Sequence, residues 1–429
     1  MPDSDRADQD AFSILQRLRG AGYEAYFAGG CVRDLLMGQT PKDFDVATSA
    51  APNQVRGLFK NTQAVGAAFG VILVREGKTT VEVATFRTDL EYRDGRRPEG
   101  VKFATAREDA QRRDFTINGL FLDPVENRII DYVGGQADLA AKTLRAIGNA
   151  DARFAEDHLR MLRAVRFASR FGFDIEPATA VAIKAHAHQI KGISPERIAE
   201  ELRKMLMPGT RDKAYRLLRQ FGFIPILLRF LSQKGPQNGD RPINLFARIP
   251  NENPISFGLG LAILVLNFRM NVTVQFDPRI WLAPAEVKRS IHAMRQSLKI
   301  SNDEADEMAG SMAFVQLLSD VPPSVAVIKR FLAQRYSDDA TLLMTSMAKC
   351  GMMSDRIQSV LAELDRWRKT EYAPPPFITG DDLTAAGATP GPKFKIALDA
   401  AYDAQLEDRI STKQQAMELA MGMIYQAGV

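Results

Sequence analysis

The chain contains little cysteine and little histidine. Its 429 residues include two cysteines, Cys31 and Cys350, and four histidines. Two cysteines so far apart in the sequence support neither a disulfide framework nor a zinc cluster, and we expect no disulfide partner for either. None of the histidines is followed by aspartate, so the His-Asp pair of a metal-dependent phosphohydrolase module is missing. These shortages indicate a reducing compartment and argue against an appended phosphatase activity.

Long hydrophobic runs and a strong excess of one charge are also missing. The best apolar run, residues 257–266, is too short for the roughly 20 residues of a membrane-spanning helix, and residues 1–10 are polar and unlike a signal peptide. The net charge is +4, which is compatible with RNA binding but does not indicate it. With 45% hydrophobic and 25% charged residues, the composition is typical of a globular protein. We therefore expect a cytoplasmic protein without a membrane partner.

The first informative feature is a glycine turn after a short strand. Residues 24–28 are expected to form the strand, Gly29 and Gly30 the turn, and residues 32–37 a helix with Gly38 behind it. Without side chains, Gly29 and Gly30 let backbone N–H groups approach an anion closely. The turn is therefore a candidate phosphate-binding site.

Paired carboxylates follow on the next extended segment. Asp43 and Asp45 are two residues apart, so both side chains share one face of a strand while Phe44 and Val46 point into a core. Two adjacent carboxylates repel each other unless a cation lies between them. Because Mg²⁺ takes one or two protein carboxylates and completes its shell with water and phosphate, Asp43 and Asp45 are predicted metal ligands.

A third carboxylate lies on another alternating strand, residues 80–87. Val81 and Val83 are expected to face one way and Glu82 the other, where it is available to complete the metal site as a catalytic residue. A glycine pair after one strand, an Asp-x-Asp on the next and an acid on a third resemble the nucleotidyltransferase superfamily that includes DNA polymerase β.

Two longer motifs narrow the resemblance. Residues 111–119 (Gln-Arg-Arg-Asp-Phe-Thr-Ile-Asn-Gly) and 156–167 closely resemble the class II tRNA nucleotidyltransferases, or CCA-adding enzymes, and the related bacterial poly(A) polymerases. Residues 91–99 are similar to the flexible loop of that family. Gly119 is a departure, because the family more often has alanine there, and it implies only a packing change.

The helix that follows Asp157 has two contrasting sides. On a wheel of about 100° per residue, its arginines are expected on one side and an apolar set on the other. After Asp157 no acidic residue occurs until Asp174, so the arginines lack partners four residues further along the helix and are predicted to bind phosphates. The arginine side comprises Arg160, Arg163, Arg166 and Arg170, and the apolar side comprises Met161, Val165, Ala168 and Phe171.

Asp157 and Arg160 are predicted to read the base of the incoming nucleotide. Three residues apart, they are expected to lie on one helical turn and to orient each other's side chains. Ionised Asp only accepts hydrogen bonds and Arg only donates them. Cytosine and adenine both offer an amino donor beside a ring-nitrogen acceptor, whereas guanine and uracil offer a carbonyl beside a ring N–H. The pair would therefore accept C and A and reject G and U. The alternative is an ordinary intrahelical salt bridge.

The family resemblance implies further roles for individual residues. It assigns Gly30, Arg33 and Arg113 to nucleotide binding, and it places Asp114 and Asn118 near the ribose. It also implies a two-metal Mg²⁺ site in which one ion activates the RNA 3′-hydroxyl for in-line attack on the α-phosphate and the other steadies pyrophosphate. Residues that join the nucleotide pocket by this resemblance are Asp157, Arg160, Arg163 and Arg166.

We expect an α+β protein: a polymerase-β-like nucleotidyltransferase head, built from a mixed sheet with helices, followed by an all-helical neck, body and tail. The helical signal is plain at residues 194–202, with serine before proline, acids in the first turn and a 3.6-residue apolar rhythm. In the tail, Lys393, Lys395 and Lys413 are either tRNA contacts, by analogy with the family, or ordinary surface lysines. The expected boundaries are 1–150 for the head, 151–210 for the neck with base recognition, 211–373 for the body and 374–429 for the tail.

Three activities compete. The first is addition of CCA to the 3′ end of tRNA, with CTP and ATP as substrates, and an enzyme restricted to CC or to A is a narrower version of it. The second is a poly(A) polymerase. The third is an RNA-binding protein with a decayed site, which the presence of Asp43, Asp45 and Glu82 disfavours. Residues 93–98, in the loop that resembles the CCA-adding pattern, favour CCA addition.

Overall fold

The structure is a computed structural model that describes residues 3–66, 70–77, 79–89, 100–231, 243–272 and 277–426. The chain divides into two compact units. Residues 1–205 and 209–227 make up the first, and residues 206–208 and 228–429 make up the second. The expected division into head, neck, body and tail stays a prediction, since the first unit holds both the head and most of the neck.

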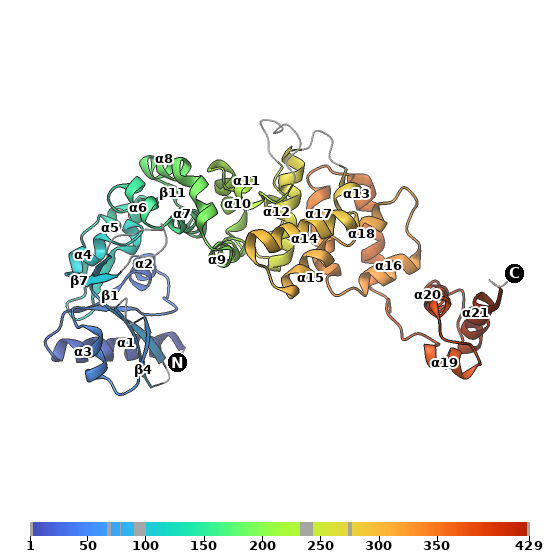
Figure 1. Cartoon of the computed structure of the whole chain (residues 1–429), viewed down its shortest axis with the longest axis horizontal. Coiled ribbons are helices and arrows are strands. Elements are labelled where there is room, and N and C mark those ends of the chain that lie inside the picture. Colours follow the sequence, from blue (N-terminus) through green and yellow to red (C-terminus); the bar gives the residue numbers. More distant parts are fainter. Residues whose placement is uncertain are drawn as a thin grey trace. The chain divides into compact units, whose positions relative to one another are not determined.

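A mixed sheet forms the centre of the first unit (Figure 1). Within the described residues it has seven strands in the order β3-β4-β5-β2-β1-β8-β9. Strands β2 and β5 run parallel, whereas the other neighbours are antiparallel. The strands are β1 (Ala25–Ala28), β2 (Val46–Thr48), β3 (Thr62–Gly66), β4 (Val71–Glu76), β5 (Thr79–Thr85), β8 (Leu120–Asp123) and β9 (Arg128–Asp131).

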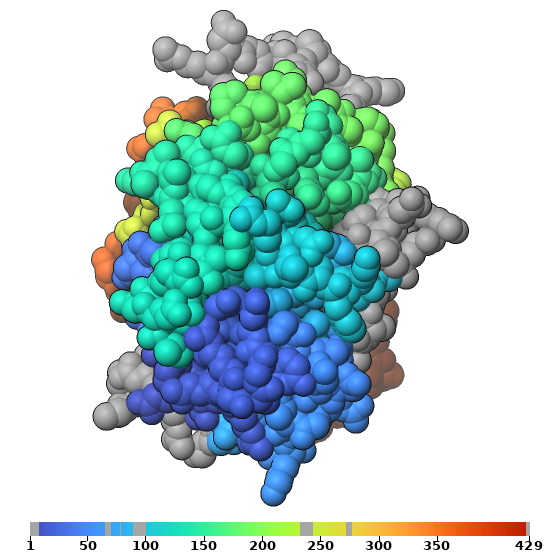
Figure 2. Space-filling model, turned by 90° about the vertical axis from the view of Figure 1, so that its left-hand side faces the viewer, coloured from blue at the N-terminus to red at the C-terminus, as the bar shows by residue number. Residues whose placement is uncertain are grey.

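Helices cover both faces of this sheet because its strands alternate. In β1, Ala25 and Phe27 join one apolar core, whereas Tyr26 and Ala28 join the other. The first core also takes residues of α1 (Asp3–Gly20) and α3 (Pro52–Leu58), and the second takes residues of α4 (Ala106–Gln111). Figure 2 shows this unit from another side, where its blue, cyan and teal segments form one closely packed surface.

The rest of the first unit is mostly helical. Helix α9 begins at Pro195, as the sequence predicts. The expected all-helical neck has one exception, because β11 pairs in parallel with β10 of the head. The helices are α2 (Gly30–Leu36), α5 (Gly135–Ala140), α6 (Ala150–Glu156), α7 (Leu159–Phe171), α8 (Pro177–His186), α9 (Pro195–Met205), α10 (Arg211–Gln220) and α11 (Phe223–Leu227). The short strand pairs are β6 (Arg87–Asp89) with β7 (Val101–Phe103), and β10 (Thr143–Leu144) with β11 (Asp174–Ile175). The 3₁₀ turns are η2 (Thr116–Asn118) and η3 (Ala187–Gly192).

Helices also build the second unit. Its centre is α12, an apolar helix that is buried along most of its length. No helix in the described ranges combines the length and the apolar character needed to cross a lipid bilayer. The helices are α12 (Phe257–Val272), α13 (Pro278–Trp281), α14 (Pro284–Leu298), α15 (Asn302–Ser311), α16 (Val325–Leu332), α17 (Ser337–Ala348), α18 (Ser354–Arg368), α19 (Gly380–Ala385), α20 (Pro392–Leu406) and α21 (Lys413–Gln426), with 3₁₀ turns η4 (Leu245–Arg248) and η5 (Val315–Leu318).

The last three helices form a small cluster with its own apolar core. The Nζ of Lys413 lies 2.5 Å from Oδ1 of Asp382, and the Nζ of Lys393 donates to the carbonyl of Ile424 at 3.3 Å. Both lysines therefore make contacts within the tail, and their contact with tRNA stays a prediction.

Candidate nucleotide-binding site

The glycine turn is one part of the site. Strand β1 ends at Ala28, and the next residue, Gly29, has a φ of 72°, a backbone conformation that residues with a side chain rarely adopt. A Cβ there would also lie 2.8 Å from Nη1 of Arg113. Gly30 follows as the first residue of α2. The positive φ therefore favours glycine at position 29, and the turn brings the backbone close to an arginine.

The paired aspartates lie beside this turn, directly before β2. Phe44 and Val46, which alternate with the two aspartates along the chain, are buried in the core, as the alternation predicts. Val46 lies opposite Val83 of the parallel strand β5, so the neighbouring residue Glu82 comes close to Asp45. Asp45 is exposed to solvent, but partial loss of water around its carboxylate and the charges of Glu82 and Asp43 raise its pKa to about 6, against the opposing effect of Arg113.

Of the three predicted carboxylates, Asp43 and Asp45 fit a magnesium site as a pair of ligands, without Glu82 as a third. Among the described residues, no hydrogen bond or ion pair reaches the side chains of Asp43 and Asp45, and no group of three or more potential ligands is assembled. Glu82 therefore acts on Asp45 through its charge, and its role as a third ligand stays a prediction. Two carboxylates that lie close together are suitable ligands for a hard cation such as Mg²⁺.

A single buried aspartate holds the two arginines of the second motif. Oδ1 of Asp109 accepts from Nε and Nη2 of Arg112 at 2.9 and 2.7 Å, and Oδ2 accepts from Nη2 of Arg113 at 2.9 Å. The sequence analysis missed Asp109. Its spacing of three and four residues before the two arginines is the signal that could have identified it.

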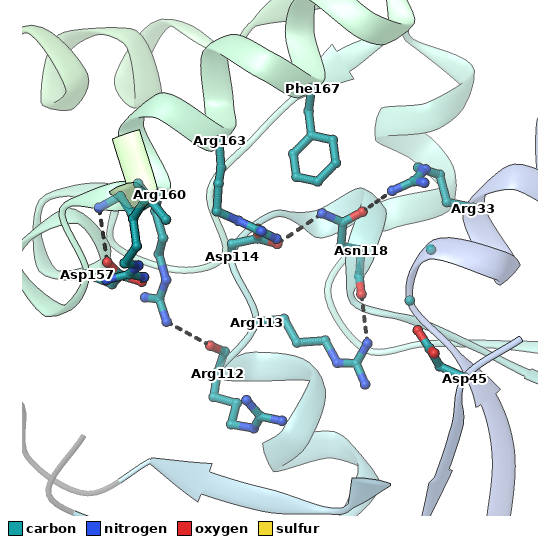
Figure 3. A pocket seen from close by; sticks show the side chains of 14 residues that line it. Arg33, Asp45, Arg112, Arg113, Asp114, Asn118, Asp157, Arg160, Arg163 and Phe167 are labelled. Atoms are coloured by element: carbon teal, nitrogen blue, oxygen red, sulfur yellow. Dashed lines mark hydrogen bonds and ion pairs between the residues drawn. The ribbon is translucent and has the colours of Figure 1, made fainter. Parts of the chain in front are cut away.

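Asp114 and Asn118 form the middle of a hydrogen-bonded chain (Figure 3). Arg163 donates through Nε to Oδ2 of Asp114 at 2.8 Å, and Nδ2 of Asn118 donates to the other oxygen at 3.0 Å. Nη1 of Arg33 donates to Oδ1 of Asn118 at 2.6 Å. Burial alone would raise the pKa of Asp114, but Arg163 and the hydrogen bonds from Asn118 and Phe115 lower it to about 2. These four residues are therefore fixed in one network.

Asp157 and Arg160 lie in the same pocket but do not pair with each other, so the expected pair on one helical turn is wrong. Asp157 caps the end of α6 in an extended conformation, before α7 begins. Its Oδ2 accepts from Arg197 at 3.2 Å, whereas Arg160 donates to Oε2 of Glu156 at 2.5 Å. The break between the two helices separates side chains that a continuous helix would have brought together.

The arginines of α7 also have partners that the local sequence does not reveal. Arg163 pairs with Asp114 at 2.6 Å, and Arg166 pairs with the buried Glu201 of α9 at 3.0 Å. Acidic partners further along α7 are missing, as the sequence indicates, but these arginines are paired nevertheless, because the acids come from distant parts of the chain. The arginines are partly shielded and held in place rather than freely solvated.

Two phenylalanines on α7 lie among these arginines. The sequence analysis missed Phe167, which lines the pocket, and wrongly expected Phe171 on the apolar side. The two rings stack with centroids 6.0 Å apart and planes at 6°. The guanidinium of Arg170 lies 4.9 Å from the centroid of Phe171. Phe167 comes seven positions after Arg160, which is close to two helical turns. This spacing could have been used to predict that Phe167 lies on the arginine side.

Together these residues enclose a cavity of about 520 Å³ in the first unit (Figure 3). Of the predicted site residues, Asp43, Glu82 and Arg166 do not line the cavity. The charges of Glu82 and Asp43 nevertheless raise the pKa of Asp45, which does line it. The predicted loop at residues 91–99 lies outside the described residues. The lining comprises Gly29, Gly30, Arg33, Asp45, Arg112, Arg113, Asp114, Asn118, Asp157, Leu159, Arg160, Arg163, Phe167 and Arg197.

One departure from the family pattern has a local explanation. A Cβ at Gly119 would lie 2.7 Å from Cγ2 of Val133 and 3.2 Å from Cδ1 of Ile147. Glycine therefore fits the packing behind the pocket in this chain, in line with the expected packing change.

Two family models match the chain. Residues 25–145 match the model described as a poly A polymerase head domain, and residues 172–234 match one described as a probable RNA and SrmB-binding site of polymerase A. The first range contains the sheet, the paired aspartates and the motif at residues 111–119.

The relatives that match most of this chain carry two different names. The chain is 34% identical to the CCA-adding enzyme of Lacticaseibacillus paracasei, over 93% of this chain and 91% of that one. It is 35% identical to poly(A) polymerase I of Salmonella typhimurium, over 78% of this chain and 75% of that one. A crystal structure of the Bacillus stearothermophilus CCA-adding enzyme in complex with CTP matches with a TM-score of 0.72 at 29% identity, over 96% of this chain and 97% of the other.

Proposed function

This chain belongs to the family of CCA-adding enzymes and bacterial poly(A) polymerases, and from that premise we propose that it adds CCA to the 3′ end of tRNA, with CTP and ATP as donors. The observation that carries the proposal is that Asp157 and Arg160 line the same cavity as the phosphate-binding candidates and Asp45. A base reader and a reacting centre thus share one site.

In the proposed reaction, the terminal 3′-oxygen of the RNA bonds to the α-phosphorus while the bond to pyrophosphate breaks. Asp43 and Asp45 would hold Mg²⁺, which supplies electrophilic stabilisation of the phosphate and a more acidic 3′-hydroxyl. Arg33 and Arg163 offer N–H donors to the triphosphate, and the Gly29 turn leaves its backbone open to the phosphates. All of these groups except Asp43 line the cavity.

Base selection is assigned to Asp157 and Arg160. Each side chain is oriented by its own partner, Arg197 for Asp157 and Glu156 for Arg160. A carboxylate beside a guanidinium complements the edges of cytosine and adenine, and it leaves a polar group unpaired when guanine or uracil is presented. The protein would thus supply the information that a template supplies in other polymerases.

A poly(A) polymerase is the second candidate, because the identity to that relative is 35%. The share of this chain that each match covers favours CCA addition, because the match to the L. paracasei enzyme covers 93% of it and the match to the poly(A) polymerase covers 78%. We place either reaction in the cytoplasm, where tRNA and nucleoside triphosphates are both present.

The deciding experiment incubates the purified protein and Mg²⁺ with a tRNA transcript that lacks its 3′ CCA. CTP and ATP are given together and singly, with GTP and UTP as controls, and the products are resolved at single-nucleotide length. Addition of C, C and A followed by a stop supports CCA addition. Two added C residues or a single A identify the narrower enzymes. Long tails from ATP alone identify a poly(A) polymerase, and no extension by any nucleotide contradicts both proposals.

A further inference from the structure

Four arginines surround the stacked rings of Phe167 and Phe171. Over the Phe167 ring, the guanidinium carbons of Arg166, Arg163 and Arg33 lie 4.3, 5.3 and 5.6 Å from the centroid. Arg33 also lies 4.6 Å from the centroid of Phe171. Arg33 therefore lies close to both rings, and it comes from α2, whereas the rings belong to α7 (Figure 3).

The carboxylates around these arginines do not match them in number. In the described part of the chain, Asp34 pairs with both Arg33 at 2.6 Å and Arg170 at 3.7 Å. Asp114 and Glu201 take one arginine each. Four guanidiniums thus share three carboxylates, and one positive charge is left over.

Two of these four arginines are shielded from water, whereas the side chains of Arg163 and Arg170 are 34% and 48% exposed. The side chains of Arg33 and Arg166 are only 5% and 11% exposed. Burial, together with the charges of Arg163 and Arg170, lowers the pKa of Arg166 to about 10. A further favourable contact would reduce the repulsion at the two shielded arginines, Arg33 and Arg166, when no nucleotide is bound.

Aromatic faces can do this, because the ring quadrupole places negative charge above and below the plane. The orientation of the rings is itself fixed by the core. Phe167 packs edge-on against the buried Phe115 at 5.9 Å and 78°, and Phe171 contacts Phe173 at 5.7 Å. The rings are therefore rigid supports, not side chains that follow the arginines.

We propose that Phe167 and Phe171 form an aromatic platform that holds Arg33 and Arg163, the two of these arginines that line the cavity, in position to receive the triphosphate of the incoming nucleotide. They are positioning residues, because they act through the arginines. This inference rests on the proposed function of the pocket. In a rival account, the two rings only fill space in the core, and any apolar group of the same size would serve equally well.

The test changes the charge distribution of the ring and leaves its shape almost unchanged. Phenylalanine at 167 is replaced in the full-length protein by its 4-fluoro, 3,5-difluoro and 3,4,5-trifluoro forms, which progressively weaken the negative face. Equilibrium binding of ATP and of CTP is measured with Mg²⁺ but without RNA. We expect affinity to fall with each fluorine, by about tenfold in total for the trifluoro form.

The same series at Phe171 should give a smaller loss, because of the two arginines over that ring only Arg33 lines the cavity. The control series is placed at Phe154, a fully buried ring of α6. There, fluorination changes only core packing, and nucleotide affinity should stay constant.

The substitution Phe167→Leu adds a second readout. It keeps an apolar side chain and removes the π face, so the platform account expects a higher KM for nucleotide and a smaller change in kcat. Affinity that stays level or rises as fluorine is added at Phe167 would overturn the platform. Failure of the wild-type protein to bind ATP or CTP would instead overturn the proposed function, so the two failures are distinguishable.

Discussion

On one side of the pocket Arg163 and Arg160 are each held by a carboxylate, whereas on the other side Asp45 faces two further carboxylates, Glu82 and Asp43. We call these the arginine side and the carboxylate side. Hydrogen-bonded ion pairs fix the arginine side before any ligand arrives. The carboxylate side carries like charges that Arg113 offsets only in part, and a bound cation would offset them further. The arginine side is preorganised, and the carboxylate side depends on a bound cation.

The largest effect should come from the carboxylate side. Asp45→Asn removes a predicted metal ligand, and we expect nucleotide incorporation to fall about 1,000-fold or more, because electrophilic stabilisation by a metal is worth several kcal/mol. The melting temperature should be unchanged or higher, since the raised pKa of Asp45 means that its charge destabilises the fold. Single-turnover incorporation and thermal unfolding measure the two effects.

The matched control is Asp174→Asn, at a carboxylate of the same unit whose side chain is 99% exposed. It should leave both quantities unchanged. Incorporation by Asp45→Asn within a factor of two of wild type would show that the carboxylate side does not hold the reactive metal.

On the arginine side, the same kind of change should act mainly on stability. Asp114→Asn leaves Arg163 and the amide of Asn118 without the buried carboxylate that they share, and we expect the free energy of unfolding to fall by about 3 kcal/mol. Asp138→Asn, which disturbs a carboxylate bonded to Arg145 outside the pocket, is the matched control. Both variants should be less stable in urea, but only Asp114→Asn should also bind ATP more weakly.

Acid provides a second way to examine Asp114. Its pKa in the folded protein is about 2, below the ordinary value of 3.8. The stabilisation from this carboxylate is therefore complete above about pH 4 and is lost as the pH falls toward about 2. The wild-type protein should lose more stability than Asp114→Asn between pH 5 and pH 3, and parallel losses would mean that Asp114 is not the group responsible.

A change at a base-reading residue should have a smaller effect than the changes at Asp45 and Asp114. Arg160→Lys keeps the charge but loses the planar set of donors, and we expect the preference for CTP and ATP over UTP and GTP to fall by about 10- to 100-fold. Competition assays with mixed nucleotides measure this ratio. Arg216→Lys, at a side chain that is 65% exposed on α10, is the control. A uniform loss for all four nucleotides would assign Arg160 to phosphate binding instead.

The smallest effect is expected at Arg197. It contacts Asp157 at 3.2 Å, and both side chains are partly exposed. Arg197→Gln should raise the KM for nucleotide by about threefold and leave kcat nearly unchanged, as for a weak ion pair. Steady-state incorporation at varied nucleotide concentration separates the two parameters. A large loss of turnover at saturating nucleotide would show that Arg197 does more than orient Asp157.

Local patterns predicted much of the fold and of the carboxylate side. The strand before Gly29, the burial of Phe44 and Val46, and the outward direction of Glu82 follow from alternation along a strand. The glycine turn, the paired aspartates and the family motifs belong to short segments that the sequence displays directly.

The arginine side was harder to predict because its partners are distant in sequence. Arg163 and Asp114 are separated by 49 residues, and Arg166 and Glu201 by 35. The break between α6 and α7 at Asp157 gives no clear signal either, since the residues on both sides favour helix. Only the folded chain shows that Asp157 and Arg160 have separate partners.

The most direct test of the comparison between the two sides is thermal unfolding of the protein without nucleotide, with and without Mg²⁺ at matched ionic strength. The account predicts that Mg²⁺ raises the melting temperature of the wild-type protein. It also predicts that a double variant, Asp43→Asn with Asp45→Asn, melts at or above the Mg²⁺-free wild-type temperature and does not respond to Mg²⁺. An equal response of both proteins, or none in the wild type, would contradict the claim that the carboxylate side is completed by a cation.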